Sequence, residues 1–82
     1  MHEKRHPELL LIEALRIDRA HLSNLATRWI EEFSRVGECG LAYDVFLDEM
    51  EAGAYRPSGE ALALIVEAAS VMGIQYPAKS SS

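Results

Sequence analysis

The stretch from Leu22 to Gly37, LSNLATRWIEEFSRVG, decides the fold class of this chain. Its apolar residues recur at steps of three, one, three, one and three, which is the spacing of one face of an α-helix and not of a strand. Gly37 predicts the end of this helix, because glycine readily adopts the left-handed conformation that follows a helix terminus. We expect the apolar stripe to face the core, with Trp29 and Phe33 as its anchors. The stripe comprises Leu22, Leu25, Ala26, Trp29, Ile30 and Phe33.

A first helix is predicted before this stretch, from Pro7 to about Ile17, because proline fits the first turn of a helix. Asp18 is then placed to cap the next helix. The apolar run Leu9–Ile12 is only four residues long, whereas a secretory signal needs about 7–15 apolar residues and a membrane span about 20. We therefore expect no membrane association and a cytoplasmic location.

Two more helices are predicted after Gly37. The third begins around Glu38 and ends near Gly53, and the fourth follows Ser58, a favourable N-cap, and closes at Gly73. The fourth helix is apolar over most of its circumference, so we expect it to be the most buried element. No run alternates with period two, which excludes a clear strand. The sequence predicts an all-α fold, a small bundle of about four helices.

The length of 82 residues corresponds to one domain, residues 1–82, with 1–6 and 77–82 expected to be flexible. Its composition, 49% hydrophobic and 26% charged, is that of a folded globular chain. A single cysteine, Cys39, excludes an internal disulfide and a four-thiolate zinc site, which favours a reducing compartment.

The net charge of −5 is unevenly distributed along the sequence. Residues 31–67 contain nine carboxylates and two arginines, whereas residues 1–30 are close to neutral. Nucleic-acid binding needs a basic patch to neutralise phosphates, so direct contact with nucleic acid is disfavoured.

Three carboxylates of the third helix, Asp44, Asp48 and Glu51, lie at i, i+4 and i+7 and therefore share one face. Like charges at this spacing repel, at a cost of roughly 0.2–0.5 kcal/mol for each exposed pair. Two interpretations remain open. The row is either an ordinary solvated face of an acidic protein or a surface for a basic partner.

The chain lacks a pattern that predicts catalysis. His2 and His6 are four residues apart but lie beside Pro7 at the chain end, and His21 has no metalloprotease context. Cys39 near a helix start is open to a lowered pKa, yet no triad or phosphate loop accompanies it. We expect no enzymatic activity, no metal and no cofactor. A small hydrolase or metal-binding protein remains a third class, which would need a bound metal or a cleft.

Tyr55 lies between glycine and proline in the link before the fourth helix, next to Arg56. Tyrosine and arginine are frequent at binding hot spots, so Tyr55 is a candidate partner contact. The alternative is that Tyr55 folds back as a lid over the end of the bundle.

The segment from Val36 to Met50, VGECGLAYDVFLDEM, is followed by Pro57-Ser58 and by a helix that closes with VMGI at residues 71–74. This half of the chain resembles the small Maf-type immunity proteins of bacterial polymorphic toxin systems, which are related in role to contact-dependent growth inhibition immunity proteins. The shared pattern is a Gly-Glu-x-Gly-Leu-Ala step into a helix rich in acidic and apolar residues, then a proline-containing loop. The resemblance implies a cytoplasmic antitoxin that blocks the toxic C-terminal domain of a cognate effector without catalysis.

Many toxins of this kind cut nucleic acids and carry a basic groove, which an acidic helix face complements. We therefore expect the partner to be a toxin C-terminal domain, such as a basic nuclease, and the chain to be a monomer or weak homodimer. The main alternative is a helical adaptor or dimerisation module in which the fourth helix forms the dimer seam. The predicted partner contacts are Glu38, Asp44, Asp48, Glu49, Glu51 and Tyr55.

Overall fold

This computed structural model describes residues 6–80, which contain four α-helices and one 3-10 helix. No strand occurs among these residues, so the predicted all-α bundle is confirmed. The elements are α1 (Pro7–Asp18), η1 (Arg19–His21), α2 (Asn24–Arg35), α3 (Cys39–Glu51) and α4 (Gly59–Val71).

The helix ends follow the predicted punctuation at most positions. Ser58 caps α4, since its hydroxyl accepts a hydrogen bond from the Ala61 amide at 3.2 Å. Gly37, Gly53 and Gly73 follow α2, α3 and α4 with φ values of +82°, +74° and +76°. A side chain at these φ values would be strained, which explains why glycine stands at each of them.

The prediction that Asp18 caps the second helix is wrong. Asp18 is the last residue of α1, and η1, which includes His21, separates it from α2. Ser23 is the cap instead, because its hydroxyl accepts from the Ala26 amide at 3.0 Å. The Asp18 carboxylate is buried and accepts hydrogen bonds from the link between α3 and α4.

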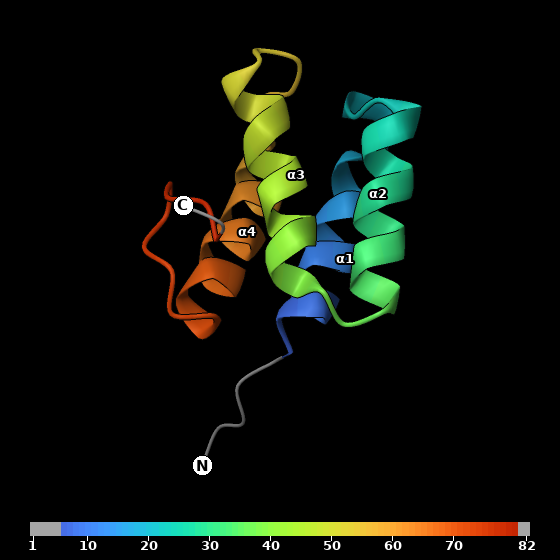
Figure 1. The fold of residues 1–82 in the computed structure, drawn as a ribbon. Helices are drawn as coiled ribbons and strands as arrows, with labels where there is room; N and C mark the ends of the chain where they lie inside the picture. The colour runs from blue at the N-terminus through green and yellow to red at the C-terminus, as the bar shows by residue number, and fades with distance from the viewer. Residues whose placement is uncertain (1–5, 81–82) are drawn as a thin grey trace.

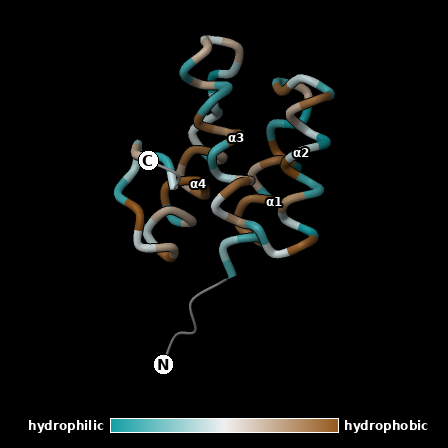
Figure 2. The backbone as a smooth tube through the Cα atoms, viewed as in Figure 1, coloured by the Kyte–Doolittle hydropathy of each residue, from teal (hydrophilic) through white to brown (hydrophobic). Residues whose placement is uncertain are grey.

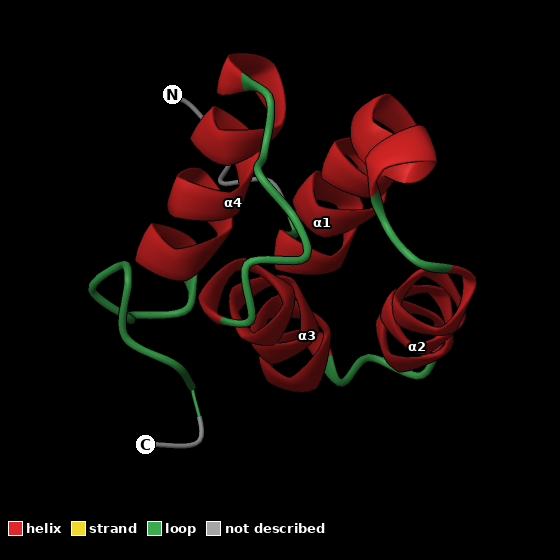
Figure 3. Cartoon of the chain, turned by 90° about the horizontal axis from the view of Figure 1, so that it is seen from above, coloured by secondary structure: helices red, strands yellow, loops and turns green. Residues whose placement is uncertain are grey.

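The helices form two pairs that pack as layers. In Figures 1 and 3, α1 lies beside α4, and α2 lies beside α3, with the short link at residues 36–38 joining the second pair. Within each pair the helices run antiparallel. The 36–38 link turns tightly, since the Glu38 amide donates to the Phe33 carbonyl at 2.8 Å.

The core is one hydrophobic cluster to which all four helices contribute. Apolar positions recur along every helix (Figure 2). The sequence predicts α4 as the most buried helix, but α1 is the central one. Helix α1 packs against α2, α3 and α4, whereas α4 packs chiefly on α1. The fully buried side chains of α1 are Leu10, Leu11, Ala14, Leu15 and Asp18.

The predicted core face of α2 is rotated in the structure. Ala26 and Ile30 are buried as expected, but Thr27 and Ser34 are buried with them. Phe33 is half-buried against the core, whereas Trp29 is 45% exposed, so Trp29 is not the core anchor that its spacing predicts. Helix α2 packs against both α1 and α3, and these two contacts determine which of its side chains are buried. The buried face is therefore centred near Ile30 and not near Trp29.

Candidate functional site

The acidic row of α3 occupies one flank of the helix, as its spacing predicts. Asp48 and Glu51 are exposed there, but Asp44 is only 7% exposed. The flank faces the segment that follows α4, residues 76–80, which we call the C-terminal strap.

The strap places a cation on the acidic row. The Lys79 Nζ atom lies 2.5 Å from Asp48 Oδ1 and 2.9 Å from Glu51 Oε1. Hydrogen bonds and charge attraction from Asp48 and Glu51 raise the pKa of Lys79 above its ordinary value, so the ammonium group stays charged. Part of the repulsion along the row is therefore relieved within the chain itself.

Asp44 holds the strap by hydrogen bonds. The Ser80 amide donates to Asp44 Oδ1 at 2.7 Å, and the Ser80 hydroxyl lies 2.9 Å from both Asp44 Oδ2 and the Gly40 carbonyl oxygen. A Cβ atom at Gly40 would stand 2.9 Å from the Ser80 Oγ atom, so glycine leaves room for the strap. Asp44 is thus a structural residue rather than an accessible contact.

The strap also docks through aromatic residues, in a stretch for which Pro77 and the serines predict flexibility. The hydroxyl of Tyr43, a fully buried residue, donates to the Ala78 carbonyl at 2.6 Å. Tyr76 is half-buried against the core, and its hydroxyl lies 3.7 Å from the Met50 sulfur.

Tyr55 is not an accessible partner contact. Its side chain is buried, its hydroxyl donates to Asp18 Oδ2 at 2.6 Å, and its ring lies 6.0 Å from that of Phe46. The Ser58 amide donates to the same Asp18 oxygen at 2.9 Å. Burial raises the pKa of Asp18, but these hydrogen bonds outweigh it and leave the pKa of Asp18 below its ordinary value. The lid interpretation of Tyr55 is confirmed.

Glu38 and Glu49 lie on the other flank of α3, the one that faces α2. Helical spacing places both on the side of Ala42 and Val45, away from the strap. Glu38 is exposed and Glu49 is half-buried. No side-chain hydrogen bond or ion pair joins either carboxylate to another of residues 6–80, so both charges are available to a partner.

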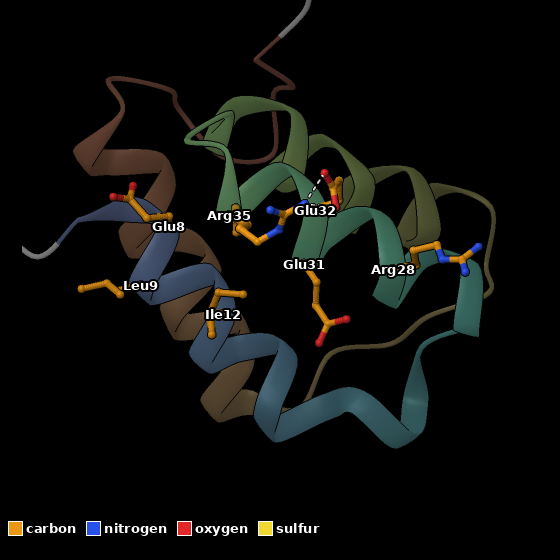
Figure 4. Close-up of a pocket in the computed structure, with 8 residues that line it drawn as sticks. Glu8, Leu9, Ile12, Arg28, Glu31, Glu32 and Arg35 are labelled. Carbon is orange, nitrogen blue, oxygen red and sulfur yellow. Dashed lines mark hydrogen bonds and ion pairs between the residues drawn. The ribbon is translucent and has the colours of Figure 1, made fainter.

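A groove with a volume of about 540 Å³ lies between α1 and α2 (Figure 4). Leu9 and Ile12 form its apolar wall, and the Ser34 hydroxyl is buried at its edge with no hydrogen-bond partner among the described residues. Both signs of charge line the α2 side, where Arg35 is hydrogen-bonded to Glu32 at 2.7 Å. This mixture selects no one class of ligand.

Of the residues considered for catalysis or metal binding, His6 and Cys39 both contact Glu8, and the His6 Nδ1 atom lies 3.6 Å from Glu8 Oε1. The Cys39 thiol donates to a Glu8 carboxylate oxygen at 3.4 Å, and burial and Glu8 raise the pKa of Cys39, contrary to an activated thiolate. No group of three potential metal ligands occurs within residues 6–80. His2 lies outside the described residues, so the His2–His6 pair has no structural description here. No described helix is long and apolar enough to cross a membrane.

Three residues that form the contacts described above, Lys79, Gly40 and Asp18, have only weak signals in the sequence. Lys79 is the only cation after Arg56, and an isolated lysine downstream of an acidic helix is a hint of pairing. Gly40 inside the first turn of α3, where glycine lowers helix stability, points to a close approach by another segment. Asp18 resembles a helix cap in the sequence, but its carboxylate instead accepts hydrogen bonds from Tyr55 and Ser58.

Comparisons with known proteins give no relative. No protein-family model, curated protein or solved structure matches this chain.

Proposed function

We propose that this chain is an immunity protein that binds and neutralises the toxic C-terminal domain of a cognate bacterial polymorphic toxin. The observation that carries the proposal is the ammonium group held between Asp48 and Glu51 on α3. This flank has the geometry and charge to receive a lysine or arginine. The role is that of a cytoplasmic, non-catalytic inhibitor.

The proposed mechanism is competition for basic residues. A toxin that acts on nucleic acid presents lysine and arginine side chains toward phosphates, and carboxylates on α3 compete for the same side chains. A basic side chain of the toxin exchanges with Lys79 at little net cost, because surface ion pairs are each worth only about 0–1 kcal/mol. Long-range attraction also speeds the encounter.

The burial of Asp44 and Tyr55 narrows the predicted contact set. Asp44 holds Ser80, and Tyr55 holds Asp18, so neither side chain is open to a partner. The contacts that stay in the proposal are Glu38, Asp48, Glu49 and Glu51.

The test is growth rescue together with co-purification. Cells that express the toxin domain encoded beside this gene should stop growing, and co-expression of this chain should restore growth and yield a stable complex. An active toxin with neither rescue nor complex contradicts the proposal.

A charge test separates the α3 surface from general acidity. Asp48→Asn with Glu51→Gln should weaken toxin binding at low salt and lose that effect at high salt, because exposed charges are screened. The matched control is Glu60→Gln with Glu67→Gln, which removes the same charge from exposed positions on α4. Equal losses in both double variants would exclude α3 as the specific surface.

A further inference from the structure

An apolar surface runs along α2 and the start of α3. Leu25 is 63% and Trp29 45% exposed, and Val36 and Leu41 are each more than one third exposed. We call these four residues the α2–α3 apolar face. Exposed apolar residues that occur singly are normal, but a contiguous group that includes tryptophan marks an interaction site.

Three of these residues share one flank of α2, and Leu41 lies in the first turn of α3, directly after the link that joins the two helices. Leu25, Trp29 and Val36 are spaced at i, i+4 and i+11, so they lie along one flank of α2. Phe33, on which Trp29 stacks, borders this flank on the core side, and Glu32, which lines the groove with α1, borders it on the other side. On α3, Leu41 lies three residues before Asp44 and seven before Asp48, so helical spacing places it on the outward side of α3, beside the exposed Asp48. The link brings the end of α2 and the start of α3 to the same end of the pair (Figures 1 and 3). Val36 follows α2 directly, and Leu41 is the third residue of α3.

Trp29 is held ready for contact in this surface. Its ring stacks on that of Phe33 with centroids 5.3 Å apart and an interplanar angle of 22°. Phe33 in turn packs against the core. A tryptophan fixed before binding loses little conformational freedom on binding, which favours affinity, and tryptophan is enriched among binding hot spots.

The charges beside the face select the class of partner. The charges that α3 places near this face are acidic: Asp48 lies beside Leu41, and Glu38 and Glu49, on the side of Val45, have no ion-pair partner among residues 6–80. A protein surface with an apolar centre and a rim of lysine or arginine is complementary to this arrangement. A second copy of the chain is a poorer match, because each copy carries a net charge of −5 and the two acidic surfaces repel each other.

We propose that the α2–α3 apolar face is the main docking site for a partner protein with an apolar centre and a basic rim, with Trp29 as the anchor. The inference deepens the proposed immunity function, on which the identity of that partner as a toxin domain rests. Asp48 and Glu51 then form the edge of the interface, and the energy comes chiefly from Trp29, Leu25 and Leu41.

The binding test uses the toxin domain encoded beside this gene, carrying an inactivating substitution. Trp29→Ala should lower the affinity by at least about 30-fold, since hot-spot truncations cost about 2 kcal/mol or more. Leu25→Ser should lower the affinity for the toxin domain by about tenfold. Leu25 is too exposed for this change to affect folding strongly. The matched control is Leu9→Ser, since Leu9 is another strongly exposed leucine and lies on the groove side of α1. This variant should bind with an affinity within about twofold of the wild type.

Rates separate the two parts of the interface. Trp29→Ala should mainly raise the dissociation rate, whereas Glu38→Gln with Glu49→Gln should mainly slow association at low salt. Trp29 is also the only tryptophan in the chain, so 5-fluorotryptophan labelling gives one ¹⁹F resonance. That resonance should shift when the toxin domain binds.

The outcomes distinguish the two levels of the proposal. If the wild-type protein binds and rescues growth but Trp29→Ala and Leu25→Ser both bind within twofold of it, the docking face is wrong and the immunity function stands. If the wild-type protein neither binds nor rescues, the immunity function fails and this assignment fails with it. A wild-type dimer that Trp29→Ala dissociates would overturn the assignment in favour of a second copy.

Discussion

Among the carboxylates that tie distant parts of this chain together, Asp18 and the Asp48–Glu51 pair form ties that differ in kind. Asp18 is 1% exposed and binds a tyrosine hydroxyl and a backbone amide from the α3–α4 link. On α3, Asp48 and Glu51 are exposed and bind Lys79 of the strap. A buried hydrogen-bonded group is costly to leave unpaired, whereas a surface ion pair exchanges freely. The first tie therefore maintains the fold, and only the second can be exchanged for a partner.

The largest expected effect is that of breaking the buried tie. Asp18→Ala leaves the Tyr55 hydroxyl and the Ser58 amide without their acceptor, and we expect a loss of about 3 kcal/mol in the free energy of unfolding. Urea denaturation followed by circular dichroism measures it. Tyr55→Phe is the matched control, because it removes one hydrogen bond and keeps the ring on Phe46, and it should cost about 1 kcal/mol. A midpoint for Asp18→Ala equal to that of the wild type would contradict a structural role for Asp18.

The pH dependence of folding stability gives a second test of the structural role of Asp18. The pKa of Asp18 is lowered in the folded chain from an ordinary value of 3.8, so its contribution is complete above that value and is lost as pH falls through the folded pKa. We expect the stability of the wild type to fall more steeply below about pH 4 than that of Asp18→Asn. Acid titrations of both proteins, followed by circular dichroism, compare the slopes. Parallel curves would show that Asp18 is not the group responsible.

A smaller and local effect is expected where the strap is held. Asp44→Ala removes the acceptor of the Ser80 amide and hydroxyl and should cost about 1 kcal/mol. Hydrogen exchange should speed up in residues 76–80 and stay slow in α1 and α4. Gly40→Ala is a second way to the same result, because the added Cβ displaces Ser80 and leaves the acidic row intact. Loss of protection throughout the bundle would mean that the strap is part of the cooperative core.

The smallest effect on stability is expected for Lys79. Lys79→Gln removes two surface ion pairs, each of which contributes little to stability, so thermal unfolding should be almost unchanged. In this variant no lysine of the strap competes for Asp48 and Glu51, so toxin binding at low salt should be stronger than that of the wild type. Calorimetry at two salt concentrations measures both quantities. Weaker toxin binding by Lys79→Gln would mean that the lysine itself belongs to the interface.

Local signals in the sequence predict the helices well and their mutual contacts poorly. The glycines after α2, α3 and α4 and the Ser58 cap act within one turn of chain, so their effect is readable without the rest of the fold. Trp29 shows what such local signals leave open. The helical period places Trp29 on the apolar stripe of α2, but it does not determine which edge of that stripe is buried. Which side is buried depends on where α1 and α3 lie.

The candidate site shows the same limit. Helical spacing correctly groups Asp44, Asp48 and Glu51, because that grouping is a property of one helix. Their division into a buried acceptor and two exposed carboxylates depends on Lys79 and Ser80, and Ser80 is 36 residues from Asp44. No short-range pattern relates positions so far apart.

The tie at Asp18 also has a consequence for the order in which the chain assembles. It joins residues 37 and 40 positions apart, so it closes a long loop, whereas α2 and α3 meet across a short link. Since the entropy cost of closure rises with loop length, we expect the α2–α3 hairpin to form first and α4 to dock on α1 late. Changes at Asp18 should then act mainly on the unfolding rate, with φ-values near zero. The hairpin that carries Trp29 would be the nucleus on which the rest of the molecule folds.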